Sequence, residues 1–269
     1  MHTALTIAGS DSGGGAGIQA DLKTFAAHGV FGTSAITAIT AQNTTGVTAV
    51  LALPADLVTA QIEAVATDIG ADAVKTGMLA SAAIVEAVAA AIASLDLPRV
   101  VVDPVMITKS GDALLEEEAV AALRTELLPR ALVVTPNVPE AEVLAEMKIA
   151  TLHDARRAAK RIREMGPKAV VVKGGHLEGD EATDVFWDGH EMVELSAPRL
   201  ASASTHGTGC TFASAIAANL ALGVPLGEAV ARAKEYLTGA IRHAPGLGRG
   251  HGPLHHFWRQ DAAEAARRG

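Results

Sequence analysis

The sequence contains a single cysteine and very few aromatic residues. Cys210 is the only cysteine among 269 residues, which excludes an intramolecular disulfide bond and is typical of a reducing compartment. We therefore expect a cytoplasmic protein. Aromatic side chains make up only 3% of the chain, although 49% of the residues are hydrophobic. The core must therefore be built from aliphatic side chains, which suits helices packed closely on a sheet.

An excess of positive charge is also missing, as are long apolar runs. The formal net charge is −8 at neutral pH, which argues against a nucleic-acid partner, because such proteins usually carry a basic face. We find no run of about 18 apolar residues free of charges and turn signals, so no membrane span is predicted. The first residues lack the basic start and long apolar stretch of a signal peptide. We therefore expect neither nucleic acid nor membrane as a partner.

Short β-branched runs alternate with alanine-rich segments of helical periodicity along the whole chain. This rhythm predicts a largely parallel sheet with helices on both faces. We expect one α/β domain over residues 1–260 and a polar, frayed tail over 261–269. Predicted strands cover residues 4–8, 34–41, 46–53, 73–76, 99–102, 132–135 and 169–173, with a hairpin over 183–195. Predicted helices cover residues 18–26, 55–68, 82–93, 116–127, 139–144, 154–165, 208–222 and 226–243.

A glycine-rich loop, residues 9–17, follows the first predicted strand and precedes a helix. Its spacing does not match the G-x-G-x-x-G dinucleotide fingerprint, and the chain has no G-x-x-x-x-G-K-[ST] phosphate loop. A nicotinamide-dependent enzyme is therefore disfavoured. Consecutive glycines still let a ligand approach main-chain N–H groups, and the helix start behind them favours an anion.

The second glycine turn is the more specific signal. Gly207, Thr208 and Gly209 directly precede Cys210 and a helix of small residues. Backbone N–H groups in such a turn form a nest for negative charge, which the helix dipole reinforces. A helix start also lowers the pKa of a thiol, so Cys210 is predicted to act as a general base toward a substrate hydroxyl. The alternative is that Cys210 is only a small buried hydrophobic residue.

Motifs spread along the chain resemble one kinase family in their order. They lie at residues 8–23, 37–43, 75–79, 103–106, 135–142, 172–176, 206–212 and 252–256. Together they resemble the hydroxymethylpyrimidine kinase and phosphomethylpyrimidine kinase family of the ribokinase-like superfamily. Sugar kinases of that superfamily usually carry aspartate at the position of Cys210, which makes a sugar kinase less favoured.

The resemblance implies a fold, an activity and partners. The implied fold is a ribokinase-like three-layer sandwich with a mostly parallel central sheet and small β flap elements. The implied activity is a bifunctional, ATP-dependent phosphorylation of 4-amino-5-hydroxymethyl-2-methylpyrimidine and then of its monophosphate, in thiamine biosynthesis. ATP is the implied co-substrate, Mg²⁺ the implied cofactor, and a homodimer the implied assembly.

The resemblance also implies roles for single residues. Contacts to the pyrimidine are implied for Ala16, Asp21, Gln42, Met78 and Val105, beside a catalytic turn of Gly207, Thr208, Gly209 and Cys210. ATP contacts are implied for Lys173, Asp184 and Asn137, and metal contacts for Glu140 and Asp103. The amide of Gln42 is both donor and acceptor, so it suits an aminopyrimidine edge. For Lys109, a phosphate contact and plain solvent exposure are equally open.

Two other functions stay open at this point. A pyridoxal or pyridoxine kinase of the same superfamily also phosphorylates a hydroxymethyl heteroaromatic compound. A catalytically silent pyrimidine-binding regulatory protein would be of a different class. Lys173, Glu140 and the glycine turn before Cys210 speak against the silent protein, because they are the residues of a working kinase.

Overall fold

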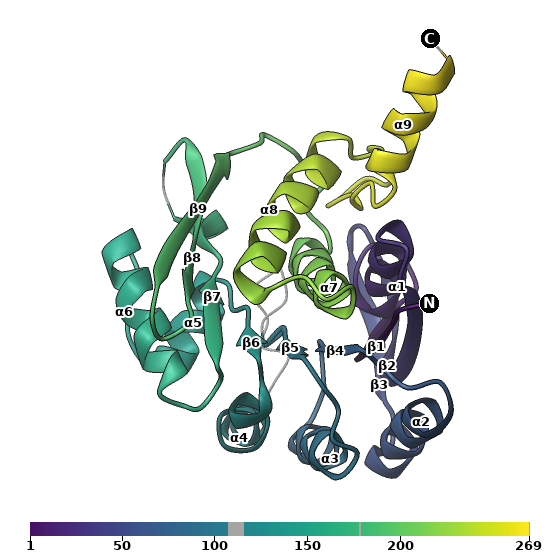
Figure 1. The fold of residues 1–269 in the computed structure, drawn as a ribbon, viewed down its shortest axis with the longest axis vertical. Coiled ribbons are helices and arrows are strands. Elements are labelled where there is room, and N and C mark those ends of the chain that lie inside the picture. The colour runs from purple at the N-terminus through teal and green to yellow at the C-terminus, as the bar shows by residue number, and fades with distance from the viewer. Residues whose placement is uncertain (107–115, 178, 269) are drawn as a thin grey trace.

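A nine-stranded sheet forms the centre of the computed structural model, which describes residues 1–106, 116–177 and 179–268 (Figure 1). The strand order is β3-β2-β1-β4-β5-β6-β7-β8-β9. Strands from β2 to β7 in this order are parallel, whereas β3 at one edge and β8 and β9 at the other are antiparallel. The strands are β1 (Thr3–Asp11), β2 (Phe31–Asn43), β3 (Gly46–Ala52), β4 (Ala73–Thr76), β5 (Val100–Val102), β6 (Val133–Val134), β7 (Ala169–Val172), β8 (Glu181–Trp187) and β9 (Met192–Pro198).

Helices cover both faces of this sheet, as the predicted three-layer arrangement requires. The helices α1, α7 and α8 lie on one side of the sheet in Figure 1, and α2, α3 and α4 lie on the other. The α-helices are α1 (Gly17–Ala27), α2 (Ala55–Asp68), α3 (Ala82–Ser94), α4 (Glu117–Ala122), α5 (Val138–Ala145), α6 (Leu152–Arg163), α7 (Thr208–Ala221), α8 (Leu226–Arg242) and α9 (Trp258–Arg268). The predicted fold class is therefore confirmed.

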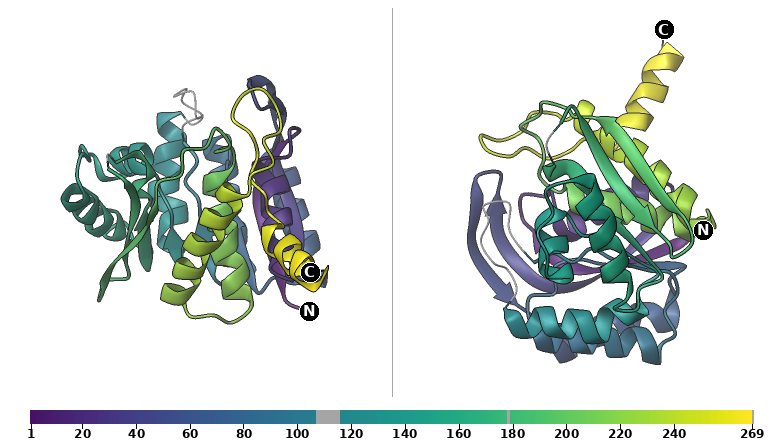
Figure 2. Two further views of the ribbon diagram at one scale, coloured as in Figure 1. Left: turned by 90° about the horizontal axis from the view of Figure 1, so that it is seen from above. Right: turned by 90° about the vertical axis from the view of Figure 1, so that its left-hand side faces the viewer.

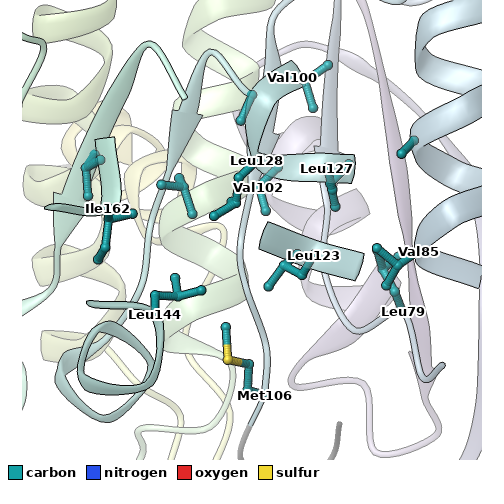
Figure 3. Packing of buried hydrophobic residues seen from close by; sticks show 14 of the residues in the cluster. Leu79, Val85, Val100, Val102, Met106, Leu123, Leu127, Leu128, Leu144 and Ile162 are labelled. Atoms are coloured by element: carbon teal, nitrogen blue, oxygen red, sulfur yellow. The ribbon is translucent and has the colours of Figure 1, made fainter. Parts of the chain in front are cut away.

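The alternation of side chains along each strand divides the core into two clusters. Val100 and Val102 of β5 belong to the cluster beneath α3 and α4, whereas Val101 belongs to the cluster beneath α7. Figure 3 shows Val100 and Val102 beside Leu127 and other buried leucines of the first cluster. Because both faces of the sheet are buried, its inner strands read as continuous apolar runs rather than alternating ones.

Small side chains bring α7 close to the sheet. Its residues from Thr211 to Ala221 are buried, and five of these eleven are alanine. Alanine permits a close approach of helix to strand, so α7 packs directly on β1, β4 and β5 and also contacts α8. Its N-terminus therefore reaches the edge at which the parallel strands end, where ligands bind in open α/β sheets.

The predicted elements agree with the observed ones in type and order, except that one predicted helix is divided. Residues 116–127 do not form one helix, because α4 ends at Ala122 and a π-helical turn (Leu123–Leu127) and a 3₁₀ turn (Leu128–Arg130) follow. The predicted hairpin over 183–195 corresponds to β8 and β9, which extend the main sheet. At the opposite edge, β3 pairs with β2, and all its residues are exposed.

The C-terminal tail differs from the prediction of a frayed segment. It forms α9, which projects from the body of the protein (Figure 2). Trp258 at its start packs against α8 at Gly239, where an added Cβ would lie 2.2 Å from the indole ring. His243 stacks on the same indole at 5.4 Å between ring centroids. The tryptophan, which precedes the polar residues, thus anchors the helix that the polar composition alone did not predict.

Candidate active site

The two glycine-rich segments lie against each other at the carboxyl edge of the sheet. Gly207 has a φ of +79°, and a Cβ there would lie 1.9 Å from the carbonyl oxygen of Gly15. A Cβ on Gly15 would in turn lie 2.5 Å from the ring of His206. Glycine is therefore required at both positions, by close approach and, at Gly207, also by backbone conformation.

Asp11 at the end of β1 holds this junction together. Its carboxylate accepts hydrogen bonds from the backbone N–H groups of Gly13, Gly15 and Ala16, at 2.8–3.0 Å. His206 Nε2 lies 2.8 Å from the same carboxylate. Although burial would raise the pKa of Asp11, the bond from His206 and those from the backbone lower it below its usual value. The carboxylate is thus charged and shapes the first glycine loop from inside.

Cys210 lies in the first turn of α7, next to a buried ion pair. Lys75 Nζ at the end of β4 lies 2.8 Å from Asp21 of α1, and neither side chain is exposed to solvent. The hydroxyls of Thr6 and Ser214 also donate to the Asp21 carboxylate, each at 2.6 Å. Burial would lower the pKa of Lys75, but Asp21 above all raises it, so the ammonium is charged. A positive charge is therefore fixed beneath the glycine turn.

The pKa of Cys210 differs from the sequence-based expectation. Burial raises the pKa of the thiol to about 11, because the loss of water outweighs the attraction of Lys75. The nearby carboxylates of Asp21 and Asp103 raise the pKa further, whereas a bond from the Gly17 backbone N–H lowers it. The expected lowering by the start of α7 is thus overruled by the desolvation of this half-buried thiol. The thiol is protonated at neutral pH.

Lys173 brings a second positive charge to the turn. It follows β7, and its Nζ lies 3.0 Å from the carboxylate of Asp103, which follows β5. A Cβ added to Gly209 would lie 3.1 Å from this Nζ and 3.3 Å from Asp103. Burial would lower the pKa of Lys173, but Asp103 and Glu140 raise it above its usual value. The predicted partners Lys173, Asp103 and Gly209 are therefore neighbours, and an anion at the turn would face a fixed ammonium group.

Asn137 and Glu140 form a capping box at the start of α5. Asn137 Oδ1 accepts from the Glu140 backbone N–H at 2.9 Å, and Glu140 Oε2 accepts from the Asn137 backbone N–H at 2.8 Å. Burial raises the pKa of Glu140 to about 7; Lys173 opposes this shift and Asp103 adds to it. An approaching cation would oppose this upward shift and favour the charged carboxylate. The structure thus gives Glu140 a capping role beside its predicted metal role.

Asp184 and Asp21 are placed differently from the predicted ligand contacts. One oxygen of Asp184 accepts from the Gly174 backbone N–H at 2.9 Å, and the other accepts from Lys234 Nζ at 2.8 Å. Asp184 therefore supports the turn that carries Lys173 instead of offering a free carboxylate to a nucleotide. Asp21 is completely buried among its partners. In this arrangement its effect on a substrate passes through Lys75.

Of the remaining predicted substrate residues, Met78 and Gln42 lie near the first glycine loop, and Val105 lies beside Asp103. The Met78 sulfur lies 3.6 Å from a Cβ placed on Gly9, and the Met78 carbonyl accepts from Thr37 at 2.6 Å. Gln42 at the end of β2 approaches His206, with 3.4 Å between their Nε2 atoms. Val105 follows the Asp103 turn, where its N–H donates to the Asp103 carbonyl. Lys109 lies outside the described residues.

Several residues of the site had no assigned role in the sequence analysis. These are Asp11, Lys75, His206 and Lys234. Lys75 carried a usable signal, because a lysine inside a short buried strand demands a charged partner. The pairing of Lys234 with Asp184 had no such signal, since it joins α8 to β8 across 50 residues of sequence.

The described residues contain no ready-made metal centre. In residues 1–106, 116–177 and 179–268, no group of three or more His, Cys, Asp or Glu side chains could hold an ion by itself. A cation here would need additional oxygen ligands from a nucleotide or from water. In the same part of the chain, no helix has the length and apolar character needed to cross a bilayer.

Comparison with known proteins places this site in a family. The family model described as phosphomethylpyrimidine kinase matches residues 11–255. A hydroxymethylpyrimidine/phosphomethylpyrimidine kinase from Rhizobium meliloti is 56% identical over 259 residues, which cover 95% of this chain and 97% of that protein.

Solved structures agree with this placement. An ADP complex of Bacillus subtilis pyridoxal kinase has a TM-score of 0.90 and 42% identity, and the match covers 97% of this chain and 99% of that one. A phosphomethylpyrimidine kinase from Clostridium difficile 630 has a TM-score of 0.81 and 47% identity, and the match covers 90% and 100%.

The sheet, the paired glycine loops and these likenesses define a kinase of the ribokinase-like class. Within that class the chain belongs to the phosphomethylpyrimidine kinase family. The family predicted from the motifs is therefore confirmed, and the prediction of a phosphotransferase with it.

Proposed function

We propose that this chain uses ATP to phosphorylate 4-amino-5-hydroxymethyl-2-methylpyrimidine and then its monophosphate, as a step of thiamine biosynthesis. The observation that carries the proposal is the turn Gly207–Cys210 at the start of α7, against which Lys173 Nζ is held by Asp103. Backbone N–H groups, a helix dipole and two buried ammonium groups converge there. Such a preorganised positive site stabilises the charge of a transferring phosphoryl group.

The proposed mechanism assigns each group one task. Lys173 and the amides of the turn hold the moving phosphoryl group, and Lys75 adds positive charge from beneath. In the first step Cys210, as its thiolate, accepts the proton of the substrate hydroxyl while that oxygen attacks the γ-phosphorus of ATP, whose bond to the bridging oxygen breaks so that ADP leaves. Because the thiol is protonated at neutral pH, only a small thiolate fraction is active. In the second step the acceptor is already an ionised phosphate, which needs no base.

Mg²⁺ fits the acidic residues of the site. The Glu140 carboxyl group has a pKa of about 7 and lies close enough to Asp103 and Lys173 for their charges to shift it. We propose that Glu140 and Asp103 hold the ion, partly through water, with Asn137 fixing Glu140 by the capping box. A bound magnesium ion would neutralise charge on the phosphate oxygens of ATP.

A pyridoxal kinase is the second candidate. It is favoured by the TM-score of 0.90 to the Bacillus subtilis enzyme. Incubation with Mg²⁺ and ATP, with each substrate in turn, separates the two when products are followed by mass. Monophosphate and then diphosphate from the pyrimidine support the proposal. Product from pyridoxal alone would keep the phosphoryl-transfer site but overturn the substrate assignment. ATP cleavage with no phosphorylated product would contradict both.

We further propose a homodimer in the cytoplasm. Support for the dimer comes from the edge of the sheet, where Val47, Val50 and Leu51 of β3 and Ile39 of β2 are large apolar side chains exposed by 43–65%. An exposed apolar strand at an edge is a site for pairing with another chain. Sedimentation of the wild type and of Leu51→Lys tests this: the variant is expected to be monomeric, and a monomeric wild type would contradict the proposal.

A further inference from the structure

Two hydrogen bonds to Ser12 hold the backbone of Gln42, so the orientation of its side-chain amide decides what it offers to a ligand. Ser12 Oγ donates to the Gln42 carbonyl at 2.7 Å and accepts from the Gln42 N–H at 2.8 Å. The register between β2 and β3 shifts between Ala41 and Gln42, so a bulge aims this residue out of the regular ladder. The contact of Gln42 with a ligand therefore depends on the orientation of its side-chain amide, that is, on which neighbour the oxygen faces and which the nitrogen faces.

Two neighbours flank that amide. The structure places Gln42 Oε1 3.1 Å from Thr40 Oγ1 and Gln42 Nε2 3.4 Å from His206 Nε2, and the hydrogen-bond partners of these neighbours require the two amide atoms to be exchanged. Thr40 Oγ1 is also 2.9 Å from the carbonyl oxygen of Ser10. His206 Nε2 is also 2.8 Å from Asp11 Oδ2. The oxygen and nitrogen of a glutamine amide are told apart by such partners.

Counting protons decides the orientation. The Asp11 carboxylate accepts three backbone N–H groups, so it is an acceptor, and His206 Nε2 must carry the proton between them. A protonated Nε2 cannot accept from Gln42, so the amide oxygen must face His206. The single hydroxyl proton of Thr40 goes to the nearer Ser10 carbonyl, which can only accept. Thr40 Oγ1 is then left to accept a hydrogen bond from the Gln42 NH₂ group.

We propose that Thr40 and His206 are positioning residues that fix the amide of Gln42 with its oxygen toward His206 and its NH₂ toward Thr40, and thereby set the preference for a 4-aminopyrimidine. This inference rests on the proposed contact of Gln42 with the substrate. The outer edge of the fixed amide keeps one acceptor and one N–H donor side by side.

That pair matches a specific class of substrate. A 4-aminopyrimidine offers an amine donor next to a ring-nitrogen acceptor, which a carboxamide binds by two hydrogen bonds, as it does the corresponding edge of adenine. The order of donor and acceptor matters, because the hydroxymethyl group must also reach Cys210. A pyridine ring without an exocyclic amine cannot use the pair. An amide that is already fixed in the matching order binds the aminopyrimidine without the cost of ordering the side chain.

Thr40→Val tests the proposal, because it removes the hydroxyl while nearly keeping the shape. Thr33→Val is the matched control: Thr33 is also buried on β2, and its hydroxyl also donates to a β1 carbonyl, that of Ala4 at 3.3 Å. The measured quantity is the ratio of kcat/KM for the aminopyrimidine to kcat/KM for the same compound without its 4-amino group. Thr40→Val is expected to lower this ratio about tenfold, mainly through KM for the aminopyrimidine. Thr40→Ser is expected to restore it.

The other outcomes are decisive as well. The proposal is overturned if Thr40→Val leaves the ratio unchanged, or if Thr33→Val lowers it equally. Gln42→Leu tests the contact of Gln42 with the substrate separately from the positioning role of Thr40. If Gln42→Leu lowers the ratio and Thr40→Val does not, the substrate contact stands and only the positioning role fails. If Gln42→Leu leaves the ratio unchanged, Gln42 does not contact the substrate as proposed. That result would not contradict the proposed kinase activity.

Discussion

Asp11 and His206 are 195 residues apart in the chain, yet His206 Nε2 lies 2.8 Å from Asp11 Oδ2. This contact joins the loop that follows the first strand to the turn that begins α7. Because Asp11 also gathers the N–H groups of the first glycine loop, the two loops form one rigid wall of the site. Much of the chemistry of the protein depends on this wall.

Asp11→Asn should therefore weaken the fold in a pH-dependent way. The pKa of Asp11 is lowered from its usual value of 3.8, so the charged carboxylate stabilises the folded protein above that value. The contribution is lost as the pH falls through the folded-state pKa. At neutral pH we expect Asp11→Asn to cost ~1–3 kcal/mol in the free energy of unfolding by urea.

The same measurement at acid pH checks the sign. The difference between wild type and Asp11→Asn should shrink as the pH falls from about 4 through the lowered folded-state pKa, because Asp11 then becomes protonated in the folded protein too. Asp68→Asn, at an exposed position in the last turn of α2, serves as the control and should have little effect. A difference that stays constant with pH would show that the charge of Asp11 does not matter.

Cys210→Ala should separate the two phosphorylation steps. We expect the rate of the first step to fall ~100-fold, as for loss of a general base, and that of the second to change only slightly. In the wild type the first step should also speed up as the pH rises above neutrality, because the thiol has a pKa of about 11 and its thiolate fraction grows. In Cys210→Ala this rise should disappear. Equal losses in both steps would contradict the role of base.

We expect Lys234→Met to raise the KM for ATP indirectly, by disturbing the turn that carries Lys173. Its ammonium group neutralises Asp184, whose other oxygen holds the Gly174 N–H next to Lys173. Removing one partner of a buried pair leaves the other uncompensated, so a loss of ~3 kcal/mol in stability is expected. The KM for ATP should rise more than the KM for the pyrimidine.

The control for Lys234 is Lys148→Met, a lysine whose side chain is 92% exposed. It should change neither stability nor either KM. If Lys234→Met lowers stability but leaves KM for ATP untouched, the pair only holds β8 to α8 and does not position Lys173.

Local sequence patterns were sufficient for most of the fold. The helix Ala55–Asp68 and the strand Ala73–Thr76 have the predicted bounds, because proline, periodicity and β-branched residues all act locally there. The protonation states and the ion-pair partners of the site residues were harder to predict. The pKa of Cys210 depends on burial by segments far away in the chain, and the helix-start argument could not include that burial. The partners of Asp184 and Asp21 likewise come mostly from strands and helices distant in the sequence, so their side chains looked free in the sequence.

The most direct test of the account is the rate of phosphoryl transfer in Lys173→Met, measured in single turnovers with bound pyrimidine and excess ATP. If the moving phosphoryl group lies at the Gly207–Cys210 turn, the rate should fall ~100–1,000-fold, as when one charge-stabilising donor is removed. The dissociation constant of the pyrimidine should stay near its wild-type value, whereas the melting temperature should fall, because Asp103 is left buried without its partner. A folded variant that transfers phosphate at the wild-type rate would contradict the placement of the reaction at this turn.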